Sequence, residues 1–414
     1  GKKEIRKLKT FGTLLNLRYR CIVFLEGVFM KLVYDLKQSE REIFEKIGSY
    51  KGRNFKNQKE NFIIHGENFE ALSVLLNNGY RSKIDLIYID PPFSTSNDFI
   101  ISSERTSTIS IPKNGIIAYS DKLVGEEYIE FIRERLILLR ELLSDSGSIY
   151  LHIDYKLGHY IKIIMDEVFG EKNFINDITR IKGNPKNFKR KAYGNQKDLV
   201  LYYAKNKGNH IFNHITEPLE EEEEIVRRFN KIDSNGRKYN TIPLHAPGES
   251  QGETGGEFLG ILPPEGRHWR TSPKILEELN EEGLIEWSKN GVPRLKKFAD
   301  EHKGKKIQDI WTDFKDPQYP EYPTQKNSDM LDMIIQQSSL EKSIVLDCFC
   351  GSGSTLSAAE KFNRNFIGID ESQIAIDVAT KRLNNFELIS LFENNSKLFK
   401  KDYDVQLSFG LLRL

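Results

Sequence analysis

The chain has 414 residues, of which 29% are charged and 38% are hydrophobic, and its formal net charge is +1. This length suffices for one large domain with an appendage or for two domains, and the near-zero net charge indicates no class of partner. Three cysteines, two of them separated by one residue, exclude a disulfide framework and favour a reducing cytosol. No uninterrupted apolar run reaches the roughly 18 residues needed to cross a bilayer, so no membrane association is expected.

Apolar, β-branched runs bounded by turn residues recur along the chain and predict strands. The predicted strands are 61–66, 85–90, 147–154, 198–205, 343–349 and 365–370. Apolar residues at helical spacing, followed by a Gly, predict a helix over 126–147, and another helix is predicted over 354–362. Strands that alternate with helices predict an α/β fold with a doubly wound, mainly parallel sheet.

The pattern changes between residues 206 and 321, where Gly and Pro cluster and the periodicity fades. We interpret this region as an insertion between two halves of one sheet. The expected organisation is an N-terminal extension and helical lead-in over 1–60, a first half over 61–205, the insertion over 206–321, and a second half with a C-terminal tail over 322–414.

The strand predicted over 85–90 runs directly into two prolines and Phe93. Proline cannot donate to a sheet and restrains the residue before it, so the strand must end at Asp90. A carboxylate, a rigid turn and an aromatic ring are thus held at the carboxyl end of a strand, where open α/β sheets bind ligands. Taken alone, such a turn is usually only the end of a strand.

A second motif, VLDCFCGSGST at 345–355, follows a strand that ends at Asp347. Gly351 and Gly353 allow the backbone to turn tightly against a ligand before a helix begins. The loop lacks the Lys of a phosphate loop and the full dinucleotide fingerprint, but Asp370 ends the next strand about 20 residues later, where an acid usually binds ribose hydroxyls. Together these features predict a nucleoside-containing cofactor, whereas the glycines alone would indicate a tight connection.

These residues resemble the amino-group DNA methyltransferases that use S-adenosylmethionine. DPPF at 90–93 is similar to the catalytic motif of that family, FCGSG at 349–353 to its cofactor loop, and YPTQK at 322–326 to the segment before that loop. A catalytic motif that precedes the cofactor motif is the permuted order of the β class, which includes modification subunits of Type III restriction systems. The resemblance covers about 61–384 and departs from the family at Asn327, where proline is usual.

The resemblance implies a permuted, Rossmann-like methyltransferase fold. The catalytic half would be 61–205, the target-recognition insertion 206–321, and the cofactor-binding half 322–414.

The resemblance also implies roles for the residues of the catalytic motif. Asp90 and the carbonyl of Pro91 would accept hydrogen bonds from an exocyclic amine, which is a poor nucleophile because its lone pair is delocalised into the ring. Pro92 would help to fix these acceptors, and Phe93 would stack on a base rotated out of the duplex.

By the same resemblance, S-adenosylmethionine would be held by residues of several segments. The predicted cofactor site comprises Glu67, Thr324, Gln325, Lys326, Asp347, Phe349, Gly351, Gly353 and Asp370. Asp370 would bind the ribose hydroxyls, and residues 324–326 would line the methionine end. Glu67 would contact the adenine, with a plain surface acid as the alternative. No metal is expected.

Two basic stretches predict DNA contacts. The first, 181–197, carries basic residues without an acid, interleaved with aromatic rings, as a loop that binds the phosphate backbone requires. The second, GRHWR at 266–270, would read guanines in the major groove. The predicted DNA-binding residues are Lys182, Lys186, Lys189, Arg190, Lys191, Arg267 and Arg270. The alternatives are a solvated basic loop and a position of Trp269 in the core of the insertion.

The leading hypothesis is a site-specific DNA methyltransferase that modifies the N6 amine of adenine in a restriction-modification system. In the family it resembles, an Asp before the two prolines is usual for adenine enzymes. The alternatives are a transferase for cytosine N4 or for RNA, a dehydrogenase, which would leave DPPF without a role, and a DNA-binding module without activity. Double-stranded DNA is the expected partner, and a restriction endonuclease subunit and a second copy of the chain are open as further partners.

Overall fold

The computed structural model describes residues 22–26, 29–50, 59–92, 98–101, 116–120, 125–184, 191–217, 222–316 and 326–392. These residues form two compact units. The first comprises the described residues up to His214 and from Gln308 onward, and the second is Ile215–Ile307. The second unit lies inside the region predicted as an insertion, so the chain leaves the first unit and later returns to it.

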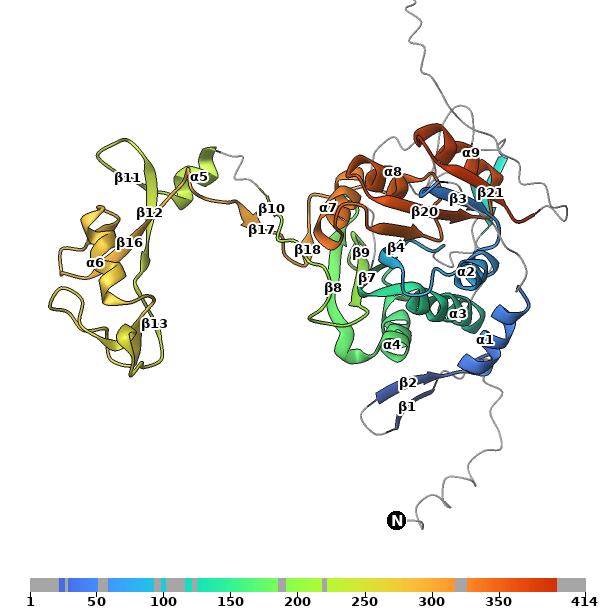
Figure 1. Cartoon of the computed structure of the whole chain (residues 1–414), viewed down its shortest axis with the longest axis horizontal. Helices are drawn as coiled ribbons and strands as arrows, with labels where there is room; N and C mark the ends of the chain where they lie inside the picture. The colour runs from blue at the N-terminus through green and yellow to red at the C-terminus, as the bar shows by residue number, and fades with distance from the viewer. Residues whose placement is uncertain are drawn as a thin grey trace, which may run out of the picture. The chain divides into compact units, whose positions relative to one another are not determined.

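Nine strands of the described chain form one sheet in the first unit (Figure 1). In spatial order they are β18 (Ile310–Trp311), β8 (Phe174–Ile181), β9 (Lys197–Ala204), β7 (Leu143–Ile153), β4 (Ile84–Ile89), β19 (Ile344–Asp347), β20 (Asn365–Asp370), β3 (Phe62–His65) and β21 (Glu387–Ser390). Neighbouring strands run parallel except at β9, which is antiparallel to both β7 and β8. This confirms the predicted doubly wound, mainly parallel α/β fold.

Strands from the two halves of the chain meet at the centre of this sheet. β4 pairs in parallel with β19, with Leu86 opposite Val345, although the second unit separates them in the sequence. From β4 the sheet extends in one direction toward β7, and from β19 it extends in the other direction toward β20. The boundary between β4 and β19 is therefore the topological switch point, where open α/β sheets bind ligands.

Helices cover both faces of the sheet (Figure 1). On one face lie α2 (Asn68–Asn77), α3 (Glu126–Leu142) and α4 (Gly158–Phe169), and on the other lie α7 (Ser328–Ser338), α8 (Ser354–Lys361) and α9 (Gln373–Arg382). Successive side chains of a strand point to opposite faces. Accordingly, Ile87 and Ile89 of β4 join the core shared with α2, α3 and α4, whereas Leu86 and Tyr88, which are also buried, do not. A strand buried on both faces has the continuous apolar sequence seen here.

The helix predicted over 126–147 ends earlier, at Leu142, and this prediction was wrong at its C-terminal end. Leu143 already has an extended backbone and pairs with Ile84 at the start of β7. Gly147 lies inside that strand, where a Cβ atom would meet the carbonyl oxygen of Ile84 at 2.9 Å. The glycine therefore permits the close approach of two strands and does not end the helix.

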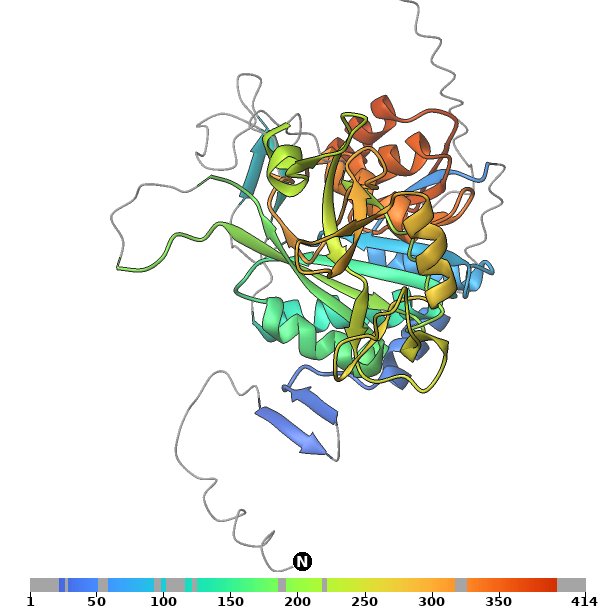
Figure 2. The ribbon, with the colours of Figure 1, turned by 90° about the vertical axis from the view of Figure 1, so that its left-hand side faces the viewer.

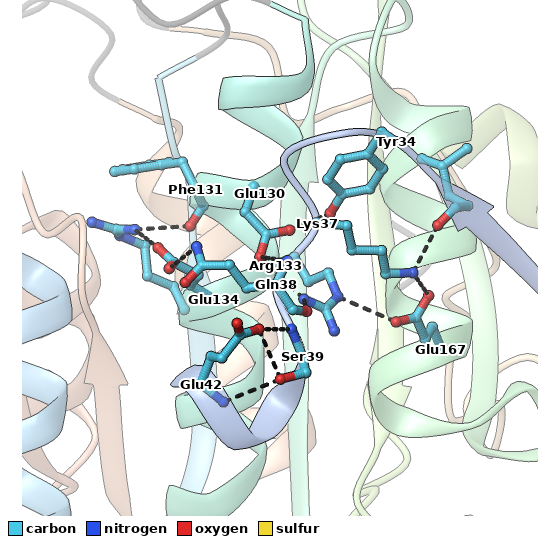
Figure 3. Close-up of polar contacts among 12 residues, drawn as sticks. Tyr34, Lys37, Gln38, Ser39, Glu42, Glu130, Phe131, Arg133, Glu134 and Glu167 are labelled. Atoms are coloured by element: carbon cyan, nitrogen blue, oxygen red, sulfur yellow. Dashed lines mark hydrogen bonds and ion pairs between the residues drawn. The ribbon is translucent and has the colours of Figure 1, made fainter. Parts of the chain in front are cut away.

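Shorter elements complete the first unit. They are the paired strands β1 (Ile22–Glu26) and β2 (Phe29–Val33), helix α1 (Glu40–Gly48), the paired strands β5 (Asp98–Ile101) and β6 (Ile116–Ser120), and the 3-10 turn η2 (Glu171–Asn173). α1 begins at a capping box, in which Ser39 and Glu42 each accept the other's backbone N–H (Figure 3).

A network of hydrogen bonds and ion pairs connects the segment before α1 with α3 and α4 (Figure 3). The Tyr34 hydroxyl donates to Glu130, and the Lys37 ammonium lies 2.5 Å from a Glu167 oxygen. The Arg133 guanidinium joins the two acids, at 3.1 Å from Glu130 and 3.2 Å from Glu167. All three of these side chains are buried or nearly so, and removing one partner of a buried ion pair costs about 3–5 kcal/mol. The network therefore stabilises the docking of the N-terminal segment.

Four described strands of the second unit form an antiparallel sheet in the order β11-β12-β16-β15. The elements of this unit are β10 (Thr216–Glu217), α5 (Glu222–Arg228), β11 (Lys231–Ile232), β12 (Lys238–Pro243), β13 (His245–Pro247), η3 (Glu253–Gly255), β14 (Arg267–Trp269), α6 (Pro273–Glu281), β15 (Ile285–Trp287), β16 (Pro293–Phe298) and β17 (Lys305–Lys306). β12 and β16 lie side by side in both views (Figures 1 and 2). The unit has its own core of Leu244, Phe258, Trp269, Leu276 and Ile285.

Candidate active site

Polar side chains gather where the parallel strands end. Asp90 follows β4, Asp347 ends β19 and Asp370 ends β20, and these three strands are neighbours in the sheet. Glu67 follows β3, the next strand along. Since parallel strands end at the same edge, the sheet brings the residue predicted for the target amine to the same edge as those predicted for the cofactor.

Asp90 has one paired and one unpaired carboxylate oxygen. Its Oδ2 lies 2.9 Å from the Lys326 ammonium, and the two side chains are 16% and 10% exposed. Its Oδ1 is shielded from solvent and has no hydrogen-bond partner among the described residues. An ionised carboxylate can only accept hydrogen bonds, and a buried acceptor without a donor costs about 1–3 kcal/mol. The N–H of a bound amine is the kind of donor that would satisfy this oxygen.

Some of the predicted site residues lie outside the part of the chain that the structure describes. They are Phe93, Lys186, Lys189, Arg190, Thr324 and Gln325. Pro91 is buried and Pro92 half-buried, directly after Asp90. Lys326, predicted at the methionine end of the cofactor, forms an ion pair with Asp90, the residue predicted for the target amine.

Glycine conformations and backbone hydrogen bonds hold the loop after β19 in a tight turn. Gly351 and Gly353 have φ angles of +50° and +76°, in the left-handed region that favours glycine, and a Cβ atom at Gly353 would lie 3.0 Å from a side chain of α9. The Phe349 N–H donates to Asp347 Oδ1 at 3.0 Å. The Gly351 N–H donates to Asp370 Oδ2 at 2.9 Å. Both acids therefore brace the loop predicted to bind the cofactor.

The carboxyl groups of Asp347 and Asp370 are shielded from water. Asp347 is 3% exposed, and burial raises its pKa to about 7, although a hydrogen bond from Thr355 opposes the rise. Desolvation also raises the pKa of Asp370 to about 6, although its oxygens accept the N–H groups of Ser372 and Gly351 at 2.9 Å. Carboxyl groups that titrate near neutrality at strand ends are typical of binding and catalytic sites.

Glu67 lies beside the glycine loop and is fixed by internal contacts. Its carboxylate accepts a backbone N–H of the first turn of α2 at 2.9 Å and forms an ion pair with Arg135. Arg135 is buried and stacks 3.5 Å from the centre of the Phe131 ring. Asn68 donates to the carbonyl of Cys348 at 3.3 Å. Neither Arg135 nor Phe131 was predicted from the sequence. The signal for Arg135 is a charged residue on the buried face of an apolar helix.

A buried histidine, also missed from the sequence, lies next to Asp90. His152 of β7 is fully buried, and its Nδ1 lies 3.9 Å from Asp90 Oδ1 and 3.0 Å from the Tyr88 hydroxyl. Its Nε2 lies 3.5 Å from Asp198 Oδ2. The motif LHID contains this histidine, but a polar residue in a buried strand is detectable as a site only when its neighbours are known.

The histidine and its aspartate have opposite shifts from their ordinary pKa values. Burial lowers the pKa of His152, and the positive charge of Lys326 lowers it further. Burial alone would raise the pKa of Asp198, but the nearby His152 and the hydrogen bond from Lys182 outweigh burial and hold that pKa far below its usual range. The pair therefore consists of a neutral imidazole and an ionised carboxylate near pH 7.

The two described basic residues of the first unit that were predicted to bind DNA differ in their contacts. The Lys182 ammonium lies 2.7 Å from Asp198 Oδ1 and belongs to an internal ion pair. Lys191 is exposed. Of the two, only Lys191 is therefore exposed.

The predicted arginines of the second unit lie around β14. Arg267 Nη1 lies 3.1 Å from His245 Nδ1, and Arg270 donates to the carbonyl of Pro243 at 3.2 Å. Both arginines are exposed. Trp269, between them, is 1% exposed and belongs to the core of the unit. This confirms the alternative prediction that Trp269 lies in the core of the insertion.

Within the described ranges, no three His, Cys, Asp or Glu side chains are grouped so as to hold a metal ion. Nor does any helix there have the length and apolar character needed to cross a membrane.

Comparisons with known proteins point to one family. A family described as "DNA methylase" (N6_N4_Mtase) matches residues 84–381. The Type II methyltransferase M.EcaI of Enterobacter cloacae is 40% identical over 329 residues, covering 78% of this chain and 69% of that protein. The probable type III restriction-modification enzyme HindVI Mod subunit of Haemophilus influenzae is 25% identical over 409 residues, covering 81% of this chain and 52% of that protein. The chain thus spans about half the length of this second relative.

Among solved structures, the M1.HpyAVI–SAM complex is similar over 78% of this chain and 98% of that one, at 18% identity and a TM-score of 0.42. The family match spans most of the chain, including both strand-end aspartates at the switch point. The resemblance seen in the sequence is confirmed, and the chain belongs to the N6/N4 family of DNA methylases.

Proposed function

We propose that the chain transfers a methyl group from S-adenosylmethionine to the N6 amine of adenine at a specific sequence in double-stranded DNA. The observation that carries this proposal is Asp90 Oδ1, a buried acceptor without a donor among the described residues, at the switch point beside the glycine loop. Membership of the family gives the class of reaction. The Asp before the two prolines favours adenine over cytosine N4 by resemblance.

The residues of the cofactor side fit a nucleoside as part of the methyl donor. Asp370 uses one acceptor position of each oxygen for a backbone N–H, which leaves further lone pairs for ribose hydroxyls. Gly351 and Gly353 keep side chains out of the turn, so the backbone can approach a ligand closely. When bound, S-adenosylmethionine supplies an electrophilic methyl group on a sulfonium.

On the target side, Asp90 and the Pro91 carbonyl would accept the two N–H groups of the amine. Acceptors aimed at these hydrogens stabilise the positive charge that develops on the nitrogen during transfer. Lys326 holds Oδ2 of Asp90 and thereby directs Oδ1 toward the substrate. The prolines restrict the backbone, so the acceptors need not reorganise during the reaction.

We further propose that the second unit, Ile215–Ile307, recognises the DNA sequence, while 61–205 and 322–414 supply the catalytic and cofactor-binding halves. The exposed side chains of Arg267 and Arg270 support a role in reading guanines. The basic loop over 181–197 would bind the phosphate backbone. The target adenine must leave the duplex to reach Asp90, as in other enzymes that act on a base.

A restriction-modification system is the proposed setting, in the cytoplasm where the chromosomal DNA lies. The relatives named as a Type II methyltransferase and as a type III Mod subunit support it. In this setting the chain would protect host DNA, and a restriction endonuclease subunit would be its partner.

The test uses a host that lacks DNA methyltransferases and expresses the chain. Nucleoside digestion and mass spectrometry identify the modified base, and sequencing of the native DNA identifies its sequence context. N6-methyladenine within one repeated sequence is the expected result. N4-methylcytosine as the sole product would show that the proposed base is wrong, and DNA without any modified base would refute the activity.

A further inference from the structure

His152 lies next to the carboxylate oxygen of Asp90 for which the described part of the chain supplies no donor. The distance from its Nδ1 to Asp90 Oδ1 is 3.9 Å, and its Nε2 faces Asp198 Oδ2 at 3.5 Å. A base whose far nitrogen is oriented by a carboxylate is the arrangement that many enzymes use to accept a proton. Such contacts are often long before substrate binds and shorten in the complex.

The neighbours of His152 select one tautomer. Asp198 is ionised and only accepts hydrogen bonds, so it favours a proton on Nε2. Nδ1 is then an acceptor, and the Tyr88 hydroxyl donates to it at 3.0 Å. The lone pair of the imidazole therefore lies on the side that faces Asp90.

Charged groups on several elements act on the imidazole. Lys326, before α7, and Arg180 of β8 disfavour its protonation, whereas Asp90 and Asp198 favour it. Because His152 is fully buried, solvent screens these interactions only weakly. The imidazole is therefore neutral before the reaction. The carboxylate of Asp198 would stabilise its charged form.

We propose that His152 takes up, by way of Asp90, the proton that the target amine releases; this inference rests on the proposed function. As the amine nitrogen bonds to the methyl carbon, the carbon–sulfur bond breaks and its electron pair stays on sulfur. The positively charged nitrogen then loses a proton to Asp90 Oδ1, which passes it to His152 Nδ1 as the Tyr88 hydroxyl turns away. Asp198 stabilises the imidazolium through Nε2–H. His152 acts through Asp90 and is thus a positioning residue.

The main test measures single-turnover methyl transfer across a range of pH. It uses the full chain, tritiated S-adenosylmethionine and genomic DNA from a host without DNA methyltransferases. The wild-type rate is expected to fall toward acid pH, because His152 then already carries a proton. His152→Asn is expected to lower the rate about 10²-fold and to remove this part of the pH dependence, since general acid–base groups contribute about that much. Cofactor affinity and the KM for DNA should stay unchanged.

Two further variants separate this role from a structural one. Asp198→Asn leaves the imidazole in place but removes its carboxylate, so the acid limb of the profile should move to lower pH, with a smaller loss of rate. His210→Asn is the matched control, because His210 packs against Tyr202 and Phe212 and takes no part in the site. Its rate and pH profile should equal those of the wild type.

A second readout does not depend on activity. The ¹⁵N spectrum of histidine-labelled enzyme is expected to show His152 neutral near pH 7 with its proton on Nε2. A proton on Nδ1 would overturn the proposal, as would a wild-type rate and pH profile in His152→Asn. If His152→Asn does not fold, an unshifted acid limb in Asp198→Asn would reject the proposal. A wild-type chain that methylates no DNA would instead refute the proposed function.

Discussion

The side of the site predicted to bind the cofactor and the side predicted to bind the target base differ in how their carboxylates are paired. On the cofactor side, both oxygens of Asp370 accept backbone N–H groups, and Asp347 accepts one from its own loop. On the target side, Lys326 holds one oxygen of Asp90, and the other has no partner among the described residues. The carboxylates of the first side are therefore paired without a ligand, whereas we propose that the substrate completes the second.

The largest effect is expected from Asp90→Ala, which removes the acceptor on the target side alone. Methyl transfer should fall by at least about 10²–10³-fold, the loss typical of removing one group that stabilises developing charge. Calorimetric titration with S-adenosylmethionine should give an affinity within a few-fold of the wild type. Asp90→Asn is the matched control, since its amide keeps one acceptor and should retain part of the activity. Loss of cofactor binding in Asp90→Ala would place this residue on the wrong side.

The reverse result is expected from Asp370→Ala on the cofactor side. Hydrogen bonds to a charged group contribute about 1.5–3 kcal/mol, so the affinity for S-adenosylmethionine should fall about 10- to 100-fold. At saturating cofactor, the transfer rate should recover to within a few-fold of the wild type. Glu371→Ala, at the exposed neighbouring position, should change neither quantity. An unchanged affinity in Asp370→Ala would contradict its assignment to the ribose.

Lys326→Met tests which side the lysine serves. If it orients Asp90, the transfer rate should fall about tenfold, in line with the loss of one partly buried ion pair, while cofactor affinity stays near that of the wild type. Lys289→Met, at an exposed position of the second unit, is the control. A large loss of cofactor affinity with a normal saturated rate would instead return Lys326 to the methionine end, as first predicted from the sequence.

The smallest effect is a pH dependence of cofactor binding. Asp347 and Asp370 have pKa values raised by desolvation to about 7 and about 6, so each is at least half protonated below about pH 6. A protonated carboxyl loses acceptor capacity, so the affinity for S-adenosylmethionine should rise a few-fold between pH 5.5 and about 7.5. Calorimetric titrations along this range measure it, and Asp347→Asn should flatten the upper part of the curve. An affinity that falls with rising pH would contradict this assignment.

Much of the fold was predictable because the sequence patterns that indicate its strands and turns are local. The apolar run before Asp90 and the run before Asp347 each form a strand, and prolines or glycines fix where the two strands end. A strand buried on both faces needs a nearly continuous apolar sequence, which is easy to recognise. Strands that alternate with helices along the chain imply a parallel sheet. The positions of both motifs at the carboxyl edge follow from that topology.

What the sequence did not reveal depends on contacts between distant segments. The ion pair of Lys326 with Asp90 joins the two halves of the chain, and His152 of β7 contacts Tyr88 of β4, Asp90 after β4 and Asp198 of β9. The end of α3 was misplaced because the pairing of Leu143 with β4 overrides a helical pattern. Such contacts leave no periodicity in the sequence, and only the folded chain shows which polar residues are partners.

A structure of the chain with a duplex shows the partner of Asp90 Oδ1 directly. The duplex should carry the sequence found to be methylated in host DNA, and sinefungin should replace the methyl donor so that no reaction occurs. An adenine outside the helix is expected, with its N6 within about 3 Å of Asp90 Oδ1. An adenine amine bound by other groups, with Asp90 Oδ1 still without a donor, would contradict it.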